Sequence, residues 1–278
     1  MENKELAALA YELRAKTVDV ICGAGCGHIG GDMSVMDVLV MLYFKHMNIS
    51  PENADHPDRD KFVMSKGHSV ESYYTVLSEK GFFPYETYRD TFSRYGSEFI
   101  GHPHNTLPGV EMNSGSLGHG LPVAVGMALA GKMDKRGYRV YTVMGDGELA
   151  EGSVWEGAMA AGHYKLDNLC AVVDRNRLQI SGGTEDVMSH EPLAQRFESF
   201  GWHVVECDGN DMDALDAAFT EAKQTKGRPT VVIANTVKGC GSPVMENKAP
   251  WHHKVPTAEE AAQIKADLMA RKEAFRHV

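Results

Sequence analysis

The sequence predicts an α/β fold in which a mostly parallel sheet is covered by helices on both faces. Short β-rich runs alternate with helical patterns along the second half of the chain, which is typical of strands joined by helical crossovers. The runs are apolar on both faces, as strands in the middle layer of such a fold must be. No linker, internal repeat or low-complexity tract interrupts the chain. We therefore interpret residues 1–278 as a single domain.

The first part of the chain is predicted to be helical. Residues 4–21 have one helical pattern and residues 34–46 a second, in which Ser34 is expected to cap the N-terminus, with Asp37 three residues later. The segment between them, CGAGCGHIGGDM, is rich in glycine and is expected to form a bend. A polar stretch at 48–61 then leads to KFVMSKGHS.

The second part of the chain supplies the predicted sheet. Four β-rich runs are expected to form strands: 139–146, 169–176, 202–209 and 229–237. Helices are expected before, between and after them: 117–132, 153–165, 190–200, 211–226 and 257–273. Asn210 or Asp211 is expected to cap the helix at 211–226. Residues after the carboxyl ends of parallel strands form the ligand crevice of such folds, and here they are Asp146, Asn176, Asp208 and the 238–253 loop.

Composition excludes several classes of function. The net charge of −10 and the lack of a long Lys/Arg run argue against nucleic-acid binding. No apolar stretch is long enough to span a bilayer, and the N-terminus lacks the order of a secretion signal. Cys22 and Cys26 are four residues apart, but no second pair with zinc-type spacing accompanies them. We therefore expect reduced, unligated thiols in a cytoplasmic protein with no nucleic-acid or membrane partner.

Asp146 lies between two glycines at the end of an apolar run, in the segment VMGDGELAEG. One interpretation is a type I′ or II turn, because Asp-Gly is a common turn pair and needs no ligand. The other is a carboxylate that shares a Mg²⁺ ion with a phosphate, which the glycines allow to approach the main chain. Asn176 follows thirty residues later, about one βαβ unit along the chain. Both side chains are therefore expected at the same edge of the sheet.

Four histidines lie in segments that contain glycine or proline: His28, His68, His102 and His252. A single histidine in such a segment is most simply a surface or core residue. Four on separate loops, in a chain that also carries Asp146 and Asn176, are expected to converge on one cleft. Because imidazole moves protons and stabilises oxyanions near neutral pH, we predict that these four residues are catalytic.

The sequence resembles a known family at these motifs. GDG followed about thirty residues later by Asn resembles the thiamin diphosphate motif. The successive segments GHxGGxxS, KFVxSxGH, GHPxxxxPGVExxxGSLGxG, GDGExxEG, DxNRLQxSG, TVKGxG and WHHKxP resemble transketolase, over residues 15–256. The α subunits of 2-oxo acid dehydrogenases and deoxyxylulose phosphate synthase are less similar. The resemblance implies a thiamin diphosphate-binding fold, with thiamin diphosphate and Mg²⁺ (or Ca²⁺ or Mn²⁺) as cofactors.

The resemblance also implies roles for individual residues. The metal would be held by the side chains of Asp146 and Asn176 and by the backbone carbonyl of Leu178. His28 and His102 would line the substrate channel and bind the sugar hydroxyls. The residues implied to contact the cofactor are His68, Gly115, Leu117, Gly147, Glu151, Asn176, Ile180, Lys238 and His252.

Within that set, Gly147 would offer its amide to the diphosphate and Glu151 would lie at a subunit interface. Two positions depart from the family pattern. His119 stands where many transketolases have Gln, and His253 stands where glycine is usual. The second departure leaves open which imidazole enters the site, and His252 is favoured because it follows Trp251 as in the family.

A complete transketolase is more than twice as long as this chain. Its pyrimidine-binding domain carries the glutamate that activates the cofactor, and no segment here resembles that domain. The resemblance therefore implies the N-terminal subunit of a split transketolase, with a C-terminal partner subunit in an α2β2 heterotetramer. Apolar faces are expected on the isolated chain, with the helix at 117–132 as the candidate packing face.

The implied reaction belongs to carbohydrate metabolism. It transfers a two-carbon ketol unit from a ketose phosphate donor to an aldose acceptor. Two alternatives stay open: a subunit of a related synthase or decarboxylating enzyme that uses the same half-site, and a non-catalytic protein that binds thiamin diphosphate.

Overall fold

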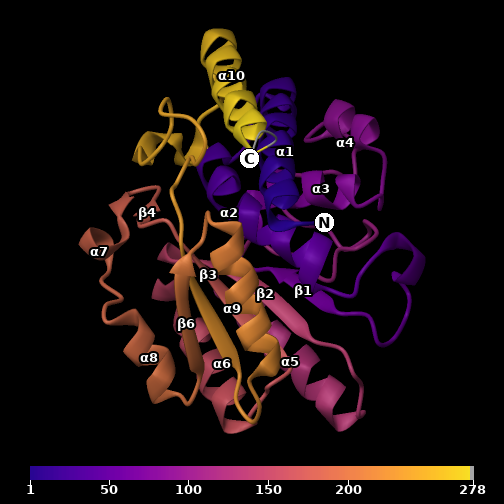
Figure 1. The fold of residues 1–278 in the computed structure, drawn as a ribbon, viewed down its shortest axis with the longest axis vertical. Helices are drawn as coiled ribbons and strands as arrows, with labels where there is room; N and C mark the ends of the chain where they lie inside the picture. The colour runs from indigo at the N-terminus through magenta and orange to yellow at the C-terminus, as the bar shows by residue number, and fades with distance from the viewer. Residues whose placement is uncertain (276–278) are drawn as a thin grey trace.

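The computed structural model describes residues 1–275 and contains a five-stranded parallel sheet (Figure 1). Its strands are β1 (Lys61–Met64), β2 (Val140–Gly145), β3 (Leu169–Arg175), β6 (His203–Asp208) and β7 (Thr230–Asn235). Their order across the sheet is β1-β2-β3-β7-β6, and every neighbouring pair is parallel. The predicted α/β fold with a mostly parallel sheet is confirmed.

Four of these strands were predicted and one was missed. β2, β3, β6 and β7 each lie inside one of the predicted β-rich runs. β1 was missed because it is only four residues long and follows a polar stretch; its pairing with β2, which places Lys61 opposite Val140, makes it a strand. A small antiparallel pair, β4 (Leu178–Gln179) and β5 (Gly182–Gly183), follows β3.

Alternate residues of each strand enter two different apolar clusters. In β3, Cys170 and Val172 join one cluster, and Leu169, Ala171 and Val173 join the other. The apolar residues of these strands therefore supply two cores, one on each face of the sheet. This burial is the main contribution that holds the helical layers against the sheet.

Helices cover both faces, as predicted. The first cluster includes residues from α1 (Asn3–Ala24), α2 (Ile29–Met41), α3 (Val70–Glu79), α4 (Tyr85–Thr91) and α9 (Met212–Gln224). The second includes residues from α5 (Gly120–Met133), α6 (Gly152–His163) and α8 (Leu193–Ser199). Figure 1 shows α9 in front of the sheet and α5 and α6 behind it.

A third apolar cluster lies away from the sheet, where α10 (Ala258–Ala274) packs along α1 (Figure 1). Val18 and Ile21 of α1 meet Ile264 and Leu268 of α10 there, and all four side chains are fully buried. The cluster also includes Trp251 from the loop that leads into α10. The last helix of the chain thus holds the His252 loop against the helices at the N-terminus. A single turn, α7 (Thr184–Val187), completes the α-helices of the described residues.

The predicted start of the second helix was wrong. α2 begins at Ile29, immediately after His28, and a π-helical turn at Leu42–His46 follows it. Gly30 and Gly31 of the expected bend lie inside the helix instead, whereas Gly25 and Gly27 lie in the bend before it with positive φ. Gly30 allows close packing, because a Cβ atom there would lie 2.6 Å from the carbonyl oxygen of Trp251. Ser34 is therefore no N-cap. It is buried within α2, and its hydroxyl donates to Asp174 Oδ2 at 2.7 Å.

The other predicted cap is confirmed at one of its two candidates. Asp211 is the N-cap of α9, and its side chain accepts a hydrogen bond from the amide of Ala214 at 2.8 Å. All five cysteines are unpaired. Among residues 1–275, no helix combines the length and apolar character needed to cross a bilayer.

The packing of α6 generates a stability prediction. A Cβ atom on Gly162 would lie 1.8 Å from the carbonyl oxygen of Phe200, so Gly162→Ala forces backbone apart. We expect a loss of about 3 kcal/mol in the free energy of unfolding, measured by urea denaturation. Gly126 of α5, with nothing within 4 Å of its Cβ position, is the control. Gly126→Ala should raise the free energy of unfolding by about 0.5–1 kcal/mol. Equal losses of stability in both variants would contradict the packing argument.

Candidate functional site

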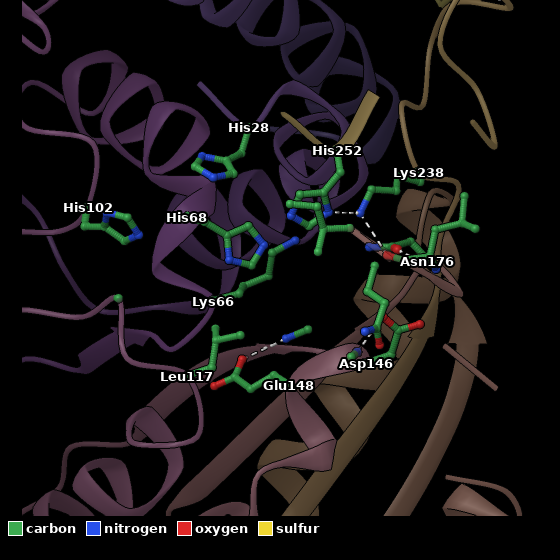
Figure 2. Close-up of a pocket in the computed structure, with 16 residues that line it drawn as sticks. His28, Lys66, His68, His102, Leu117, Asp146, Glu148, Asn176, Lys238 and His252 are labelled. Carbon is green, nitrogen blue, oxygen red and sulfur yellow. Dashed lines mark hydrogen bonds between the residues drawn. The ribbon is translucent and has the colours of Figure 1, made fainter. Parts of the chain in front are cut away.

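A cavity of about 240 Å³ opens at the carboxyl ends of β2 and β3 (Figure 2). Its lining comes from segments far apart in the sequence: His28, Lys66, His68, His102, Gly115, Leu117, Gly145, Asp146, Gly147, Glu148, Asn176, Leu178, Gln179, Ile180, Lys238 and His252. Figure 2 shows His28 and His102 toward one end of the cavity and Asp146 and Asn176 toward the other. The structure thus brings together the four histidines and the two strand-tip residues that sequence analysis had linked.

Two residues expected near the crevice are not in its lining. Glu151 lies at the start of α6 with an exposed side chain, so within this chain it does not reach the cavity. Asp208 is also exposed. It ends β6, the edge strand, and β3 and β7 lie between β6 and β2, the strand that Asp146 follows. The expectation that all the strand tips share one crevice was therefore too broad.

Asp146 is held in a fixed position at the tip of β2. It is only 2% exposed, and its two carboxylate oxygens accept hydrogen bonds from the amides of Arg177 at 2.6 Å and Gly147 at 2.9 Å. Burial, followed by the charge of Asp174, raises the pKa of Asp146 to about 6. A carboxylate in this position is stabilised by a cation, which lowers its pKa again.

Oxygen ligands for such a cation lie on the adjoining segment. Asn176 is buried, and its side-chain oxygen accepts a hydrogen bond from the amide of Leu178 at 3.2 Å. This contact folds the 176–178 segment back toward the Asp146 side chain, whose Oδ2 accepts the Arg177 amide in the same segment. Carboxylate, amide and carbonyl oxygens are the donors that Mg²⁺ takes, so the residues present fit a divalent cation. No cluster of three or more His, Cys, Asp or Glu side chains placed for metal binding occurs in the described part of the chain.

The two glycines beside Asp146 do not have the conformation that a turn of type I′ or II needs. Asp146 has φ −66° and ψ −39° and starts a 3-10 turn at Gly147–Ala150, and neither Gly145 nor Gly147 has a positive φ. A Cβ atom at Gly147 would lie 3.1 Å from Gln179 Oε1, so a side chain there requires Gln179 to shift. The type I′ or II turn is therefore wrong, and neither glycine has a backbone conformation reserved for glycine.

A buried ion pair between Lys66 and Asp174 forms part of the cavity floor. Asp174 is fully buried and pairs with the ammonium of Lys66, which is 1% exposed and also donates to the carbonyl of Gly31 at 3.0 Å. The hydroxyls of Ser34 and Thr236 donate to the same carboxylate. Burial alone would raise the pKa of Asp174, but Lys66 and these donors hold it below its ordinary value. Asp174 therefore stays ionised and joins α2, the loop after β1, β3 and the segment after β7.

Lys238 and His252 form a second polar contact at the cavity wall. The ammonium of Lys238 donates to the carbonyl of Leu178 at 2.8 Å and contacts His252 Nδ1 at 2.8 Å. Because an ammonium group only donates, Nδ1 of His252 accepts and the imidazole carries its proton on Nε2. Burial and the charge of Lys238 lower the pKa of His252 to about 3, so the ring is neutral. Burial and Lys66 lower the pKa of Lys238 to about 8.

The histidines form one cluster of neighbouring rings. The centroid of His28 lies 5.4 Å from that of His68, 5.9 Å from that of His252 and 6.2 Å from that of His102. Burial, with the charge of His253 next, lowers the pKa of His28 to about 4; burial lowers the pKa of His68 well below its ordinary value. Neutral rings both donate and accept hydrogen bonds, which suits them to binding and protonating hydroxyl groups.

The two adjacent histidines, His252 and His253, differ in their position relative to the cavity. His252 lines the cavity, whereas His253 is exposed and outside the lining. His253 nevertheless packs edge-on against His28, with ring centroids 4.5 Å apart. His119 is exposed at the N-terminus of α5 and is not in the lining.

Sequence analysis missed four residues of the lining: Lys66, Gly145, Glu148 and Gln179. Glu148 is buried and accepts hydrogen bonds from the amides of Gly118 at 2.9 Å and Gly145 at 3.0 Å, so it ties the loop that carries Leu117 to the tip of β2. Lys66 could have been found, because a charged residue inside KFVMSKGHS next to a buried strand needs a partner of opposite charge.

Comparison with known proteins agrees with this geometry. The family model "Transketolase, thiamine diphosphate binding domain" matches residues 6–276. The chain belongs to this family. It is 47% identical to one subunit of the apulose-4-phosphate transketolase of Phocaeicola vulgatus, over 98% of this chain and 96% of that protein. It is 41% identical to the 6-deoxy-6-sulfo-D-fructose transketolase subunit SqwG of a Clostridium species, over 95% and 96%.

Solved transketolases share the fold. The transketolase of Campylobacter jejuni superimposes with a TM-score of 0.92 and 29% identity, covering 99% of this chain. That match covers 46% of the Campylobacter chain, so this chain spans less than half the length of that transketolase. The transketolase thiamine diphosphate-binding fold predicted from sequence is thus confirmed.

The buried ion pair of this family member generates a second prediction. Asp174→Asn leaves the Lys66 ammonium buried without a counter-charge, and we expect a loss of about 3–5 kcal/mol in the free energy of unfolding. The control is Asp19, which pairs with Lys265 at 2.6 Å, because these side chains are 44% and 41% exposed. Asp19→Asn should change the free energy of unfolding by less than about 0.5 kcal/mol. Chemical denaturation of both variants makes the comparison. Similar small losses would show that Lys66 does not depend on Asp174.

Proposed function

We propose that this chain is the N-terminal subunit of a two-chain transketolase. It would transfer a two-carbon ketol unit from a ketose phosphate to an aldose or aldose phosphate acceptor. The observation that carries the proposal is the joint arrangement of the cavity: four imidazole side chains at one site with a buried carboxylate, Asp146, whose surroundings fit a cation. The sequence relatives support it, because two proteins named as transketolase subunits match this chain over nearly their whole length.

A C-terminal transketolase subunit is the proposed partner, in an α2β2 heterotetramer. The relatives' names as subunits support this. Exposed apolar side chains on the helices behind the sheet also support it: Val123 and Met133 of α5 are 37% and 74% exposed, and Met159 of α6 is 56% exposed. Glu151 is exposed beside these helices and is therefore available to a partner.

Thiamin diphosphate and a divalent cation would bind in the cavity. Asp146 and Asn176 would hold the cation with their side chains and Leu178 with its carbonyl, whose second lone pair is free when Lys238 uses the first. Mg²⁺ is the expected ion, and Ca²⁺ and Mn²⁺ share its preference for oxygen. When bound, thiamin diphosphate supplies the electron sink for carbon–carbon bond cleavage.

The other lining residues would hold the remaining parts of the cofactor. The amide of Gly147, which donates to Asp146 Oδ1 in this structure, would turn to the diphosphate, with Lys238, His68 and His252 as further donors. Gly115 and Leu117 would contact the aminopyrimidine ring. Ile180 is 72% exposed at the rim of the cavity, and an apolar side chain there gains burial when a cofactor or partner covers it.

His28 and His102 would act on the sugar. As neutral imidazoles they donate a hydrogen bond to one hydroxyl oxygen and accept one from another, which orients the substrate. A neutral ring with a lowered pKa accepts a proton only when negative charge develops beside it, so it returns the proton readily. The Nε2 proton of His252, fixed by Lys238, is a donor for developing negative charge on oxygen.

The proposal also includes a cytoplasmic location, a single-domain organisation and a class of donor sugars. All five thiols are free, which supports a reducing compartment such as the cytoplasm. The family match to residues 6–276 supports a single domain over 1–278. The relatives are named for apulose-4-phosphate and 6-deoxy-6-sulfo-D-fructose, so modified ketoses of this class are the donors to test alongside xylulose phosphate.

Reconstitution tests the function. The chain is coexpressed with a C-terminal transketolase subunit, and ketol transfer is measured with thiamin diphosphate, Mg²⁺ and each sugar phosphate. Transfer from a ketose phosphate to an aldose is expected only when both chains are present. Turnover with pyruvate instead would favour the synthase or decarboxylating alternative, and binding of the cofactor without turnover of any donor would favour the non-catalytic one.

Two substitutions separate cofactor binding from sugar chemistry. Asp146→Ala removes a carboxylate oxygen proposed as a metal ligand, and we expect Mg²⁺-dependent binding of thiamin diphosphate to the complex to fall below detection in calorimetry. His28→Ala leaves that end of the cavity intact, and we expect kcat to fall by roughly a hundredfold with little change in cofactor affinity. Unchanged affinity in the Asp146 variant would remove the metal assignment. A His28 variant that loses affinity but keeps kcat would remove His28 from the substrate channel.

A further inference from the structure

Two buried carboxyl groups face each other near the cleft histidines, and the proposed mechanism uses neither. Asp32 lies in the first turn of α2 and Glu71 in the first turn of α3. Both residues are at most 1% exposed, and Asp32 accepts a hydrogen bond from the amide of Ser72, the residue after Glu71, so the two carboxyl groups lie close together. Two carboxylates in contact repel, so this arrangement needs a compensating positive charge or a proton.

Within residues 1–275, no cation is available to compensate the pair. The titratable groups that face it are Lys66, Cys26, Tyr74 and Tyr88. Lys66 is the cation of that group, and it is already paired with Asp174 and bound to the Gly31 carbonyl. The pair is therefore buried without a free cation, and a second negative charge there is costly.

Among the described residues, one oxygen of each carboxyl group lacks a hydrogen-bond donor, which a single added proton would supply. Asp32 Oδ1 accepts a hydrogen bond from the amide of Ser72 at 2.8 Å. Asp32 Oδ2 and Glu71 Oε2 receive no donor from the rest of the described chain. A proton on one carboxyl donates to the other, so it supplies the missing donor and removes one charge. Burial raises the pKa of Asp32 to about 6 and that of Glu71 well above its ordinary value, in agreement with a retained proton.

We propose that Asp32 and Glu71 share one proton, and that this bridge positions His28 and His68 by tying the first turn of α2 to the first turn of α3. His28 is the residue before α2, four positions before Asp32, and His68 is three positions before Glu71. The bridge also contacts the loop that carries His28, since a Cβ atom on Gly27 would lie 2.7 Å from Glu71 Oε1. Asp32 and Glu71 are positioning residues, and their effect on turnover rests on the proposed function.

Loss of the shared proton lowers the free energy of unfolding. The folded chain holds the proton at pH values where the unfolded carboxyl groups have already lost theirs. The free energy of unfolding therefore falls as the pH rises from the ordinary carboxyl value through the raised values of the pair. Above that range two adjacent carboxylates repel and the ends of α2 and α3 separate. Glu71→Gln replaces the proton with a permanent amide donor to Asp32, so this part of the pH dependence disappears.

The shared proton is tested on the full chain without partner or sugar. The melting temperature of the wild type, Glu71→Gln and Glu71→Ala is followed from about pH 5 to about pH 8. We expect the wild type to lose more stability than the Gln variant over this range, whereas Asp146 and Glu148, whose pKa values are also raised, affect both proteins equally. Infrared difference spectra should show a protonated carboxylic acid near neutral pH that Glu71→Gln abolishes. Equal pH dependence with no such band overturns the proposal.

The positioning role has its own measurement. The imidazole resonances of His28 and His68, followed by NMR of histidine-labelled chain, should shift in Glu71→Ala and stay in place in Glu71→Gln. In the complex, Glu71→Ala should lower kcat by roughly tenfold to a hundredfold, and Glu71→Gln should restore it. Unmoved histidines in the Ala variant overturn the positioning role. Wild-type complex without ketol transfer would instead refute the proposed function, while the NMR and stability results still decide the bridge.

Discussion

The pair between Lys66 and Asp174 is the constraint on which the cavity depends. Asp174 is the second-last residue of β3 and has no access to water. It receives donors from Lys66, Ser34 and Thr236, which come from three other parts of the chain. A buried carboxylate keeps its charge only while all of these donors stay in place. The residues that neutralise Asp174 are thereby fixed relative to the strand tips, and the cavity floor is fixed with them.

This constraint also sets the charges of the cavity. Lys66 and Lys238 both contribute positive charge, and with burial they keep the imidazoles of His68 and His252 neutral. The negative charge of Asp174 has the opposite effect on Asp146, whose pKa it helps to raise. The result is a cavity with a buried carboxylate and a lysine at one end and neutral imidazoles at the other (Figure 2). That division suits an anionic tail bound through a metal ion, with uncharged hydroxyl groups beyond it.

Sequence reasoning found the parts of this site that follow from a rule and missed those that follow from packing. Parallel strands place their carboxyl ends together, so Asp146 and Asn176 could be paired from the order of the strands alone. No local pattern shows that Gly30 packs on the Trp251 carbonyl, and α2 therefore began five residues before its predicted start at Ser34. Asp174 was hidden inside an apolar run, because a buried charge is visible only once its partners are known.

Asp174 and Glu71 show two solutions to the same physical problem within one site. Each is a carboxyl group removed from water close to the histidine cluster. Asp174 receives a lysine and the hydroxyls of Ser34 and Thr236 and stays ionised, which restricts the conformational freedom of four segments. Glu71 faces another carboxyl group, and a single proton satisfies both at the cost of a dependence on pH. Because Lys66 is already engaged by Asp174, the second pair has no cation available among residues 1–275. The protonated bridge therefore follows from how the charges are distributed rather than from either residue alone.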